Sequence, residues 1–307
     1  MVIWTYLVLE DVRTTSRKLL MFASVADIVT AACFLMGSLW YILKRQFGSD
    51  TIHTDGGDEQ ANSSDITCVL IGAISSYSQS VSFWWNMATA LYLYLEIVQG
   101  KRIEAWKWLG ITHVICWGVP AIPTITAACY HVFGFNDVLM PACSISRASI
   151  CWLKGGLGFR EYIAWTILTL KGTEILTYFQ ILVLYLMIAW HVSRTSTNLI
   201  RNYQFNREDE KMLFDQTISV VLRANRKLIA VPLLLIGVRI WGTLRMIVMV
   251  AWMPSCTTPY PATEWIKVVF MLMEGAGNSA QGLANGVIFC AISNRVRSRI
   301  FHDVLKK

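Results

Sequence analysis

The chain consists of long apolar runs separated by short polar segments. Six runs are long enough to cross a bilayer as helices, because an α-helix rises about 1.5 Å per residue and the hydrocarbon core is about 30 Å thick. These runs are approximately residues 19–43, 66–98, 108–132, 161–190, 227–252 and 264–291. Residues 1–9 are apolar but too short to cross, so we interpret them as the inner end of a truncated first span. The pattern therefore predicts an all-α, polytopic membrane helical bundle.

Residues 68–98 predict the central helix of this bundle. The stretch contains one formal charge, Glu96, near its far end. Its first half is rich in Ser and Gly, which allow neighbouring helices to approach closely, whereas its second half carries several aromatic residues. A helix surrounded by lipid would contain fewer small polar and aromatic residues, so we expect this helix to have protein contacts on most sides.

Composition and charge agree with a membrane protein and give its orientation. Hydrophobic residues make up 55% of the chain and charged residues 15%. Lys and Arg number 18 in one set of connecting segments and 5 in the alternating set. The first set comprises residues 10–18, 99–107, 191–227 and 292–307. The positive-inside rule places this set, with the C-terminus, in the cytoplasm. Since the net charge of +7 is distributed by membrane side, it does not indicate nucleic-acid binding.

Residues 292–307 predict a cytoplasmic amphipathic tail. Apolar residues at helical spacing line one face, and basic residues, including Arg295 and Arg297, lie off it. A basic amphipathic helix of this kind lies on the inner leaflet of a bilayer.

The outer side carries the residues expected of the secretory route. Four cysteines fall there: Cys68, Cys143, Cys151 and Cys256. A bridge from Cys68 to Cys151 would hold the outer loop 133–160 over the mouth of the bundle. Asn62 begins an Asn-Ser-Ser glycosylation sequon in the most polar outer loop.

Ionisable residues occur inside the spans, where they are costly unless paired or hydrated. Asp27 lies about two turns from the inner face of its span, and could serve a polar switch or simply helix packing. By depth along their helices, Lys171 matches Glu274, and Glu174 matches Arg239.

We expect these four charges to form the floor of an outward-facing ligand pocket, lined also by Trp85 and Trp241. The alternative is an ion-pair lock without a ligand. If Lys171 and Glu274 pair, the double reversal Lys171→Glu with Glu274→Lys should restore the surface expression that either single reversal loses.

No pattern indicates catalysis. The chain has no HExxH, GxSxG or P-loop sequence, and no metal-ligand spacing. Residues 275–280 fit a loose GxGxxA pattern, but they lie inside an apolar span and do not follow a strand. We therefore expect no enzymatic activity, no metal and no cofactor.

Several short motifs resemble one family of receptors. They include Leu91-Tyr92-Leu93, the run Trp117-Gly118-Val119-Pro120, the stretch 227–233 with Pro232, and Gln281-Gly282. The chain lacks the Asp-Arg-Tyr and Asn-Pro-x-x-Tyr motifs of rhodopsin-like receptors. It resembles instead the secretin-like and slime-mould cyclic-AMP receptor group. Thr89 stands where secretin-like receptors carry a glutamate, so their buried polar lock does not transfer intact.

The resemblance implies a seven-transmembrane, G-protein-coupled receptor with an extracellular ligand of unknown identity, in the plasma membrane. Its partners would be a heterotrimeric G-protein, the ligand and the lipid bilayer. The expected activation and structural residues are Asp27, Tyr92, Trp117, Gly118, Pro120, Pro232, Asn278, Gln281, Gly282 and Asn285. The expected G-protein face contains Lys101, Arg102, Arg223, Arg226, Arg295 and Arg297. Pro232 would be the pivot of the sixth span, because proline weakens the helical ladder.

Two other functions remain open at this stage. A membrane transporter would favour inverted repeats and paired broken helices, and the sequence contains no internal repeat. A truncated receptor isoform that does not signal would fit the short first span.

Overall fold

The computed structural model describes residues 15–47, 66–100, 104–135, 151–154, 157–202, 236–248, 250–251, 265, 269–270, 272–278 and 280. The elements follow one another as α2 (Thr15–Phe47), α3 (Ile66–Ile97), α4 (Ala105–Cys129), β1 (Phe133–Phe135), β2 (Cys151–Leu153), α5 (Phe159–Thr166), the π-helix η3 (Ile167–Lys171) and α6 (Gly172–Asn202). Residues 236–248 and 272–278 are also helical. Four helices of the described part are long and apolar enough to cross a membrane.

The predicted spans correspond closely to the described helices. Helix α2 contains the predicted span 19–43, and α3 coincides with the predicted span 66–98. Helix α4 begins and ends three residues before the predicted 108–132. The chain turns at His131, just after its end, where φ is 52°. Helix α6 continues to Asn202, as expected if an amphipathic extension follows the fifth span.

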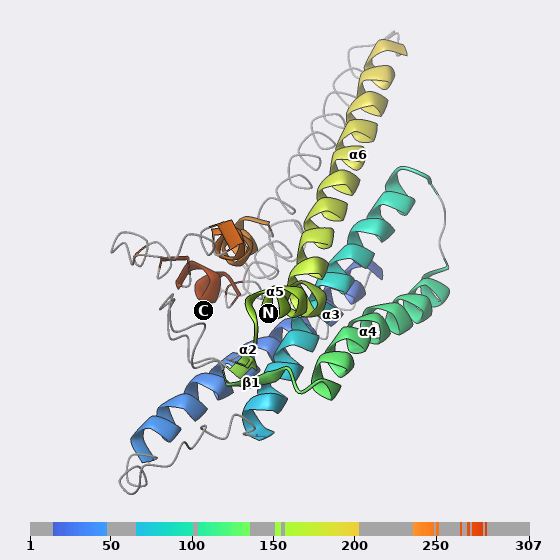
Figure 1. The fold of residues 1–307 in the computed structure, drawn as a ribbon. Coiled ribbons are helices and arrows are strands. Elements are labelled where there is room, and N and C mark those ends of the chain that lie inside the picture. The colour runs from blue at the N-terminus through green and yellow to red at the C-terminus, as the bar shows by residue number, and fades with distance from the viewer. Residues whose placement is uncertain are drawn as a thin grey trace, which may run out of the picture.

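Helix α3 is the central element, as its sequence predicts. It lies between α2 and α4 and also contacts α6, η3 and both strands (Figure 1). In its most apolar stretch 61% of residues are buried, against 22–39% in the other three long helices. Small polar residues make this packing possible, since Thr30 of α2 and Ser78 of α3 lie 2.8 Å apart, oxygen to oxygen, inside the bundle.

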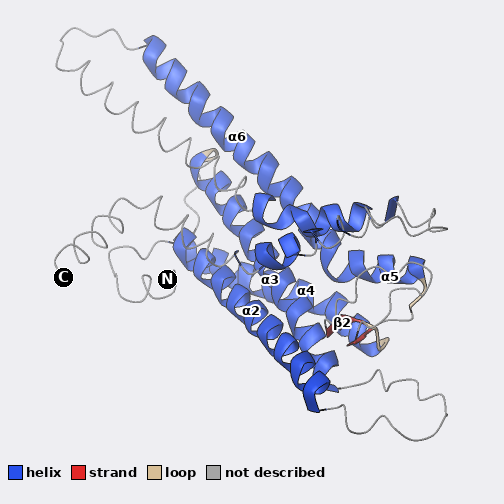
Figure 2. Ribbon diagram, turned by 90° about the vertical axis from the view of Figure 1, so that its left-hand side faces the viewer, coloured by secondary structure: helices blue, strands red, loops and turns tan. Residues whose placement is uncertain are grey.

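The loop predicted at 133–160 contains a two-stranded antiparallel sheet. In its register Phe133 faces Leu153 and Phe135 faces Cys151. The predicted disulfide between Cys68 and Cys151 is confirmed, and it fastens β2 to the beginning of α3. The sheet lies at one end of the bundle, whereas α6 projects past α3 at the other end (Figure 2).

One face of α3 is shaped to receive β2. Residues 68, 72 and 76 follow at one-turn intervals, so they form a single row along the helix. At the row's centre a Cβ on Gly72 would lie 3.1 Å from the Cα of Trp152. One turn further along, the indole Nε1 of Trp152 donates a hydrogen bond to Ser76 at 2.8 Å. The disulfide, the glycine and the serine therefore fix both the distance and the rotation of the hairpin.

Several predictions lie outside the described residues. They concern the short span 1–9, the tail 292–307, the glycosylation site and parts of the inner face. The individual residues are Asn62, Lys101, Arg102, Arg223, Arg226, Pro232, Gln281, Gly282, Asn285, Arg295 and Arg297.

We predict that Gly72→Leu destabilises the protein, because its side chain must displace the backbone of Trp152. Overpacking typically costs about 1–3 kcal/mol, which should lower the Tm by about 2–8 °C. The matched control is Gly110→Leu, since nothing lies within 4 Å of a Cβ at Gly110. Thermal unfolding in detergent measures both variants, and equal Tm values for the two would contradict the close docking of β2.

Candidate functional site

The candidate site is a layer of charged side chains in the middle of the bundle. The described residues contribute Asp27 from α2, Lys171 from η3, Glu174 from α6, and charged residues from segments 236–248 and 272–278. Asp27, Lys171, Glu174 and Arg239 are all buried. Since ionised groups in hydrocarbon need partners, the pairings define what holds these helices together.

Glu174 has the most completely bonded carboxylate of the layer. Its Oε2 accepts from Lys171 Nζ at 2.7 Å. Its Oε1 accepts from the hydroxyl of Tyr178 at 2.6 Å and from that of Thr243 at 2.9 Å. Charge-assisted bonds of this length are the strong ones, so Glu174 ties α6 firmly to segment 236–248.

Lys171 also connects to the last described segment. Its Nζ lies 3.6 Å from Glu274 Oε1, and Arg245 Nε lies 2.8 Å from Glu274 Oε2. Gly242 provides the space, because a Cβ there would collide with Glu274 and lie 2.6 Å from Lys171 Nζ. A larger residue at position 242 would therefore force the charged ends of Glu274 and Lys171 to shift.

Arg239 joins segment 236–248 to α2 and α3. Its Nη2 lies 3.8 Å from Asp27 Oδ1, and its Nη1 donates to Gln79 Oε1 at 3.5 Å. Ser82 donates to the same Asp27 oxygen at 2.7 Å. The guanidinium lies 4.6 Å above the centre of the Phe83 ring, which adds a cation–π contact.

These pairings correct the one inferred from depth alone. Lys171 does contact Glu274, as expected, but the ion partner of Arg239 is Asp27 rather than Glu174. Depth along a helix does not say in which direction around the axis a side chain points. Glu174 pairs instead with Lys171, three residues earlier and on the same helix face. An exchange of the Lys171 and Glu274 charges would set a carboxylate at position 171 against Glu174 and an ammonium at position 274 against Arg245. It should therefore not restore the wild-type network.

A π-helix gives Lys171 its direction. In η3 the N–H of Gly172 bonds to the carbonyl of Ile167, five residues back instead of four. Gly172 suits this turn, since a Cβ there would lie 2.7 Å from the Ile167 carbonyl oxygen. Ser80 of α3 donates to the Thr169 carbonyl at 3.0 Å and thereby attaches the π-turn to the central helix.

The two predicted pocket tryptophans lie away from the charges. Trp85 is two residues after Phe83, about 200° around the helix, and packs with Phe22, His113 and Trp117. Trp241 faces Phe270, with their ring centres 6.4 Å apart. Among the described residues neither ring has a contact with the charged groups that brings it into the layer, so their assignment to the ligand pocket stays a prediction.

The other residues predicted to be structural differ in how closely they pack against neighbouring helices. Trp117 packs against α3, and its carbonyl accepts from Tyr77 at 3.0 Å. Gly118 allows no close helix contact among the described residues, because it is exposed and nothing described lies within 4 Å of a Cβ there. It is on the opposite face of α4 from the packed residues. Pro120 lies inside α4, and Asn278 is half-buried in segment 272–278.

Tyr92 is buried at the end of α3 away from the sheet. Its ring centre lies 6.2 Å from that of Trp108 in α4. It belongs to the apolar cluster that joins α2, α3 and α4, and it therefore has a packing role in this structure.

Sequence reasoning missed four members of the charged layer: Tyr178, Gly242, Thr243 and Arg245. The spacing carried a usable signal, since residues 239, 242 and 245 recur every three positions and so share one helix face. A glycine between two arginines on one face of a span indicates room for a charged partner. Tyr178 lies four residues after Glu174, within reach on the same face.

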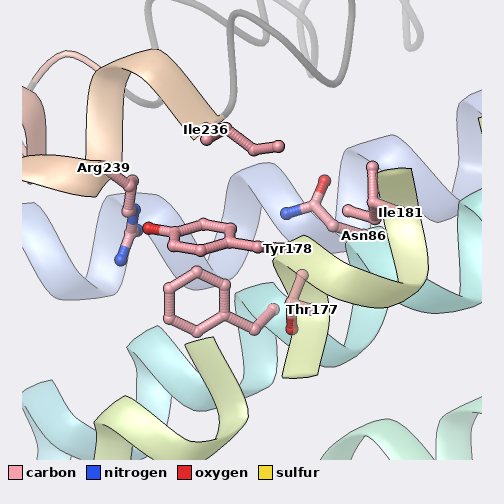
Figure 3. A pocket seen from close by; sticks show the side chains of 7 residues that line it. Asn86, Thr177, Tyr178, Ile181, Ile236 and Arg239 are labelled. Atoms are coloured by element: carbon pink, nitrogen blue, oxygen red, sulfur yellow. The ribbon is translucent and has the colours of Figure 1, made fainter. Parts of the chain in front are cut away.

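A pocket lies beside Arg239 (Figure 3). Its volume is about 280 Å³, the open space at its mouth included. The lining residues come from α3, α6 and segment 236–248, and they are Phe83, Asn86, Thr177, Tyr178, Ile181, Ile236 and Arg239.

Comparison with known proteins gives this arrangement a family. Residues 1–284 match the family model of the 7 transmembrane receptor (Secretin family). The chain is 30% identical to G-protein coupled receptor 157 of Homo sapiens over 300 residues, which cover 97% of this chain and 77% of that protein. Identity to the Mus musculus protein of the same name is 31% over 298 residues, covering 97% and 78%.

A more distant relative agrees with the resemblance seen in the motifs. Cyclic AMP receptor-like protein A of Dictyostelium discoideum is 22% identical over 199 residues, covering 65% of this chain and 43% of that protein. The family match extends through all the helices described here, including both segments that carry the charged layer. This chain belongs to the secretin family of seven-transmembrane receptors.

Proposed function

We propose that this receptor transduces an extracellular ligand to a heterotrimeric G-protein from the plasma membrane. The family membership supports the class of activity. The single structural observation that favours a switch is the charged layer, because it links α2, α3 and α6 to segments 236–248 and 272–278. A ligand that binds better to one pairing pattern than to another would shift the population of helix arrangements.

In this proposal the ligand enters from the side that carries the β1–β2 sheet. The disulfide supports that orientation, since disulfides persist outside the cytoplasm. The Lys- and Arg-rich connecting segments lie at the opposite side by the positive-inside rule, together with the C-terminus. The G-protein would then meet the far end of α6, which projects beyond α3 (Figure 2).

Arg239 is the proposed control point of the switch. It contacts Asp27, Gln79 and Phe83, so its present position binds segment 236–248 to both α2 and α3. A movement of segment 236–248 relative to α2 and α3 would break these contacts, and an agonist must compensate for the loss. Pro232, seven residues earlier in the chain, is the proposed pivot.

We predict that Asp27 and Arg239 are coupled in stability. Asp27→Asn or Arg239→Gln alone breaks their buried ion pair from one side, at a cost of about 3–5 kcal/mol, or roughly 5–10 °C in Tm. The double variant leaves neither charge, so its Tm should lie within about 3 °C of wild type. A control is Lys107→Gln, which breaks an exposed pair with Glu104 and should change little. Additive losses in the double variant would argue against a direct pair.

We predict that the same double variant signals more strongly without ligand. Loss of the ion pair removes one restraint on segment 236–248 while leaving no unpaired charge, so basal recruitment should rise about three- to tenfold, equivalent to about 1 kcal/mol. Recruitment of a panel of labelled G-protein α-subunits in cells measures this, with surface biotinylation to equalise expression. If neither wild type nor the double variant recruits any α-subunit at normal surface levels, the proposed function is wrong.

A further inference from the structure

The exposed side of α6 carries an apolar stripe that ends at a cation. Exposed apolar residues recur every three or four positions along one face of the helix, at Phe179, Val183, Leu186 and Trp190. Arg194 follows one turn later on the same face and is also exposed. The surface of α6 therefore changes from apolar to basic within a single turn.

Aromatic rings on two helices locate this change at a boundary of the bilayer. Near the sheet, the rings of Tyr130 and Trp165 lie 5.6 Å apart, centre to centre. Trp106 precedes Tyr130 by 24 residues and Trp190 follows Trp165 by 25, which is about 36–37 Å along the helices. The hydrocarbon core is about 30 Å thick, and Trp and Tyr favour the headgroup level on both sides. In the orientation proposed above, Trp106 and Trp190 mark the inner boundary, and Arg194 lies at the level of the lipid headgroups.

Arg194 is held in place by an aromatic ring but has no counter-ion. Its Cζ lies 5.3 Å from the centre of the Trp190 ring, a cation–π contact. The N–H donors of a guanidinium lie in its plane, so a contact through its face leaves them available. Arg194 makes no ion pair within the described part of the chain, and the sequence has no Asp or Glu between Glu174 and Glu208. An oriented cation at the headgroup level thus lacks an anion.

The beginning of α4 carries a similar pair whose charge is already compensated. Lys107 Nζ lies 5.5 Å from the centre of the Trp106 ring, and Trp106 is exposed as Trp190 is. However, the same ammonium pairs with Glu104 at 2.8 Å. The two aromatic–cation pairs therefore differ in their demand for an external anion, and only the one on α6 lacks an internal counter-ion among the described residues.

We propose that Trp190 and Arg194 bind the headgroup of an acidic phospholipid of the inner leaflet. The guanidinium fork matches the geometry of phosphate and carboxylate oxygens and would donate to both kinds of group. One acyl chain would lie along the apolar stripe. From Phe179 to Trp190 the stripe measures about 16 Å, close to the hydrocarbon thickness of one leaflet, about 15 Å. This length favours a lipid over a soluble anion.

Native mass spectrometry of the full receptor chain tests the lipid preference. The receptor in detergent is titrated with phosphatidylserine or with phosphatidylcholine of identical acyl chains, and the adduct populations give the binding constants. We expect Arg194→Gln to lower the phosphatidylserine binding constant about fivefold, the usual contribution of one basic residue at an acidic membrane surface. The phosphatidylcholine constant should not change. Equal binding of the two lipids by the wild-type receptor would overturn the site.

The matched control is Lys107→Gln, which lowers the net charge by the same amount at an exposed position of the same boundary. Because Glu104 already compensates Lys107, this variant should keep the wild-type preference for phosphatidylserine. Arg194→Lys retains the charge without the planar fork, so its loss should be smaller than that of Arg194→Gln. Equal losses in Arg194→Gln and Lys107→Gln would mean general attraction by net charge and would overturn the site. Thermal unfolding confirms that each variant is folded.

Competition with inorganic phosphate separates a lipid site from a simple anion site. At constant ionic strength, excess phosphate should leave the phosphatidylserine adduct in place, because the acyl chain also contributes to binding. Displacement by phosphate would show an anion site and would overturn the assignment to a lipid.

Cysteine labelling tests which leaflet supplies the lipid. Thr197→Cys, at an exposed position three residues beyond Arg194, should react with a membrane-impermeant maleimide only in permeabilised cells, relative to the wild-type background. Labelling in intact cells would overturn the assignment to the inner leaflet. The inference relies on the proposed orientation and not on signalling, so a receptor that recruits no G-protein would still show the lipid preference.

Discussion

A guanidinium and an ammonium in the hydrocarbon layer have no water to solvate them. The free energy of this desolvation determines how the helices of this receptor meet. Lys171 and Arg239 are buried, and each is within ion-pair distance of a carboxylate on a different part of the chain. A buried charge that has lost its counter-ion destabilises the folded protein strongly. The helices that carry the charges must therefore stay within a few ångströms of one another. Charge pairing thus supplies the specificity that hydrophobic burial cannot supply among lipid-solvated helices.

The central helix has a composition that serves this constraint. Eight of its 18 buried residues are serine, threonine, glutamine or asparagine, and members of this set bond to α2, to η3 and to Arg239. Small hydroxyl groups allow close packing and also satisfy neighbouring carbonyls and carboxylates. Helix α3 therefore connects the charged layer to the hairpin, since Gly72 and Ser76, which contact Trp152, lie within about three turns of Gln79 and Ser82.

Much of this arrangement was predictable from the sequence. Apolar length indicated α2, α3, α4 and α6, and the side of the membrane indicated the Cys68–Cys151 bridge. Depth along the helices correctly brought Lys171 to Glu274, but it paired Glu174 with Arg239, because a one-dimensional measure contains no rotation about the helix axis. The β1–β2 sheet was missed since its strands have three residues each, too short for an alternating pattern.

Rotation about the axis also explains why the two tryptophans lie apart from the ion pairs. Trp85 and Trp241 each lie two residues along the chain from Phe83 and Arg239 respectively, yet their rings pack with other aromatic side chains. Arg245 presents the converse case, because it lies further out along its span but its long side chain reaches Glu274. Long cationic side chains extend several ångströms beyond their own turn, so residue count underestimates their reach.

The π-turn at Ile167–Lys171 has a consequence for the comparison of related chains. A five-residue hydrogen-bonded loop holds one residue more than the corresponding α-helical turn, so the helix contains a local one-residue insertion. A relative with an uninterrupted α-helix would differ here by a single-residue gap inside a transmembrane span, where alignments rarely admit one. Without that gap, the position equivalent to Lys171 would be assigned to the wrong face, about 100° away.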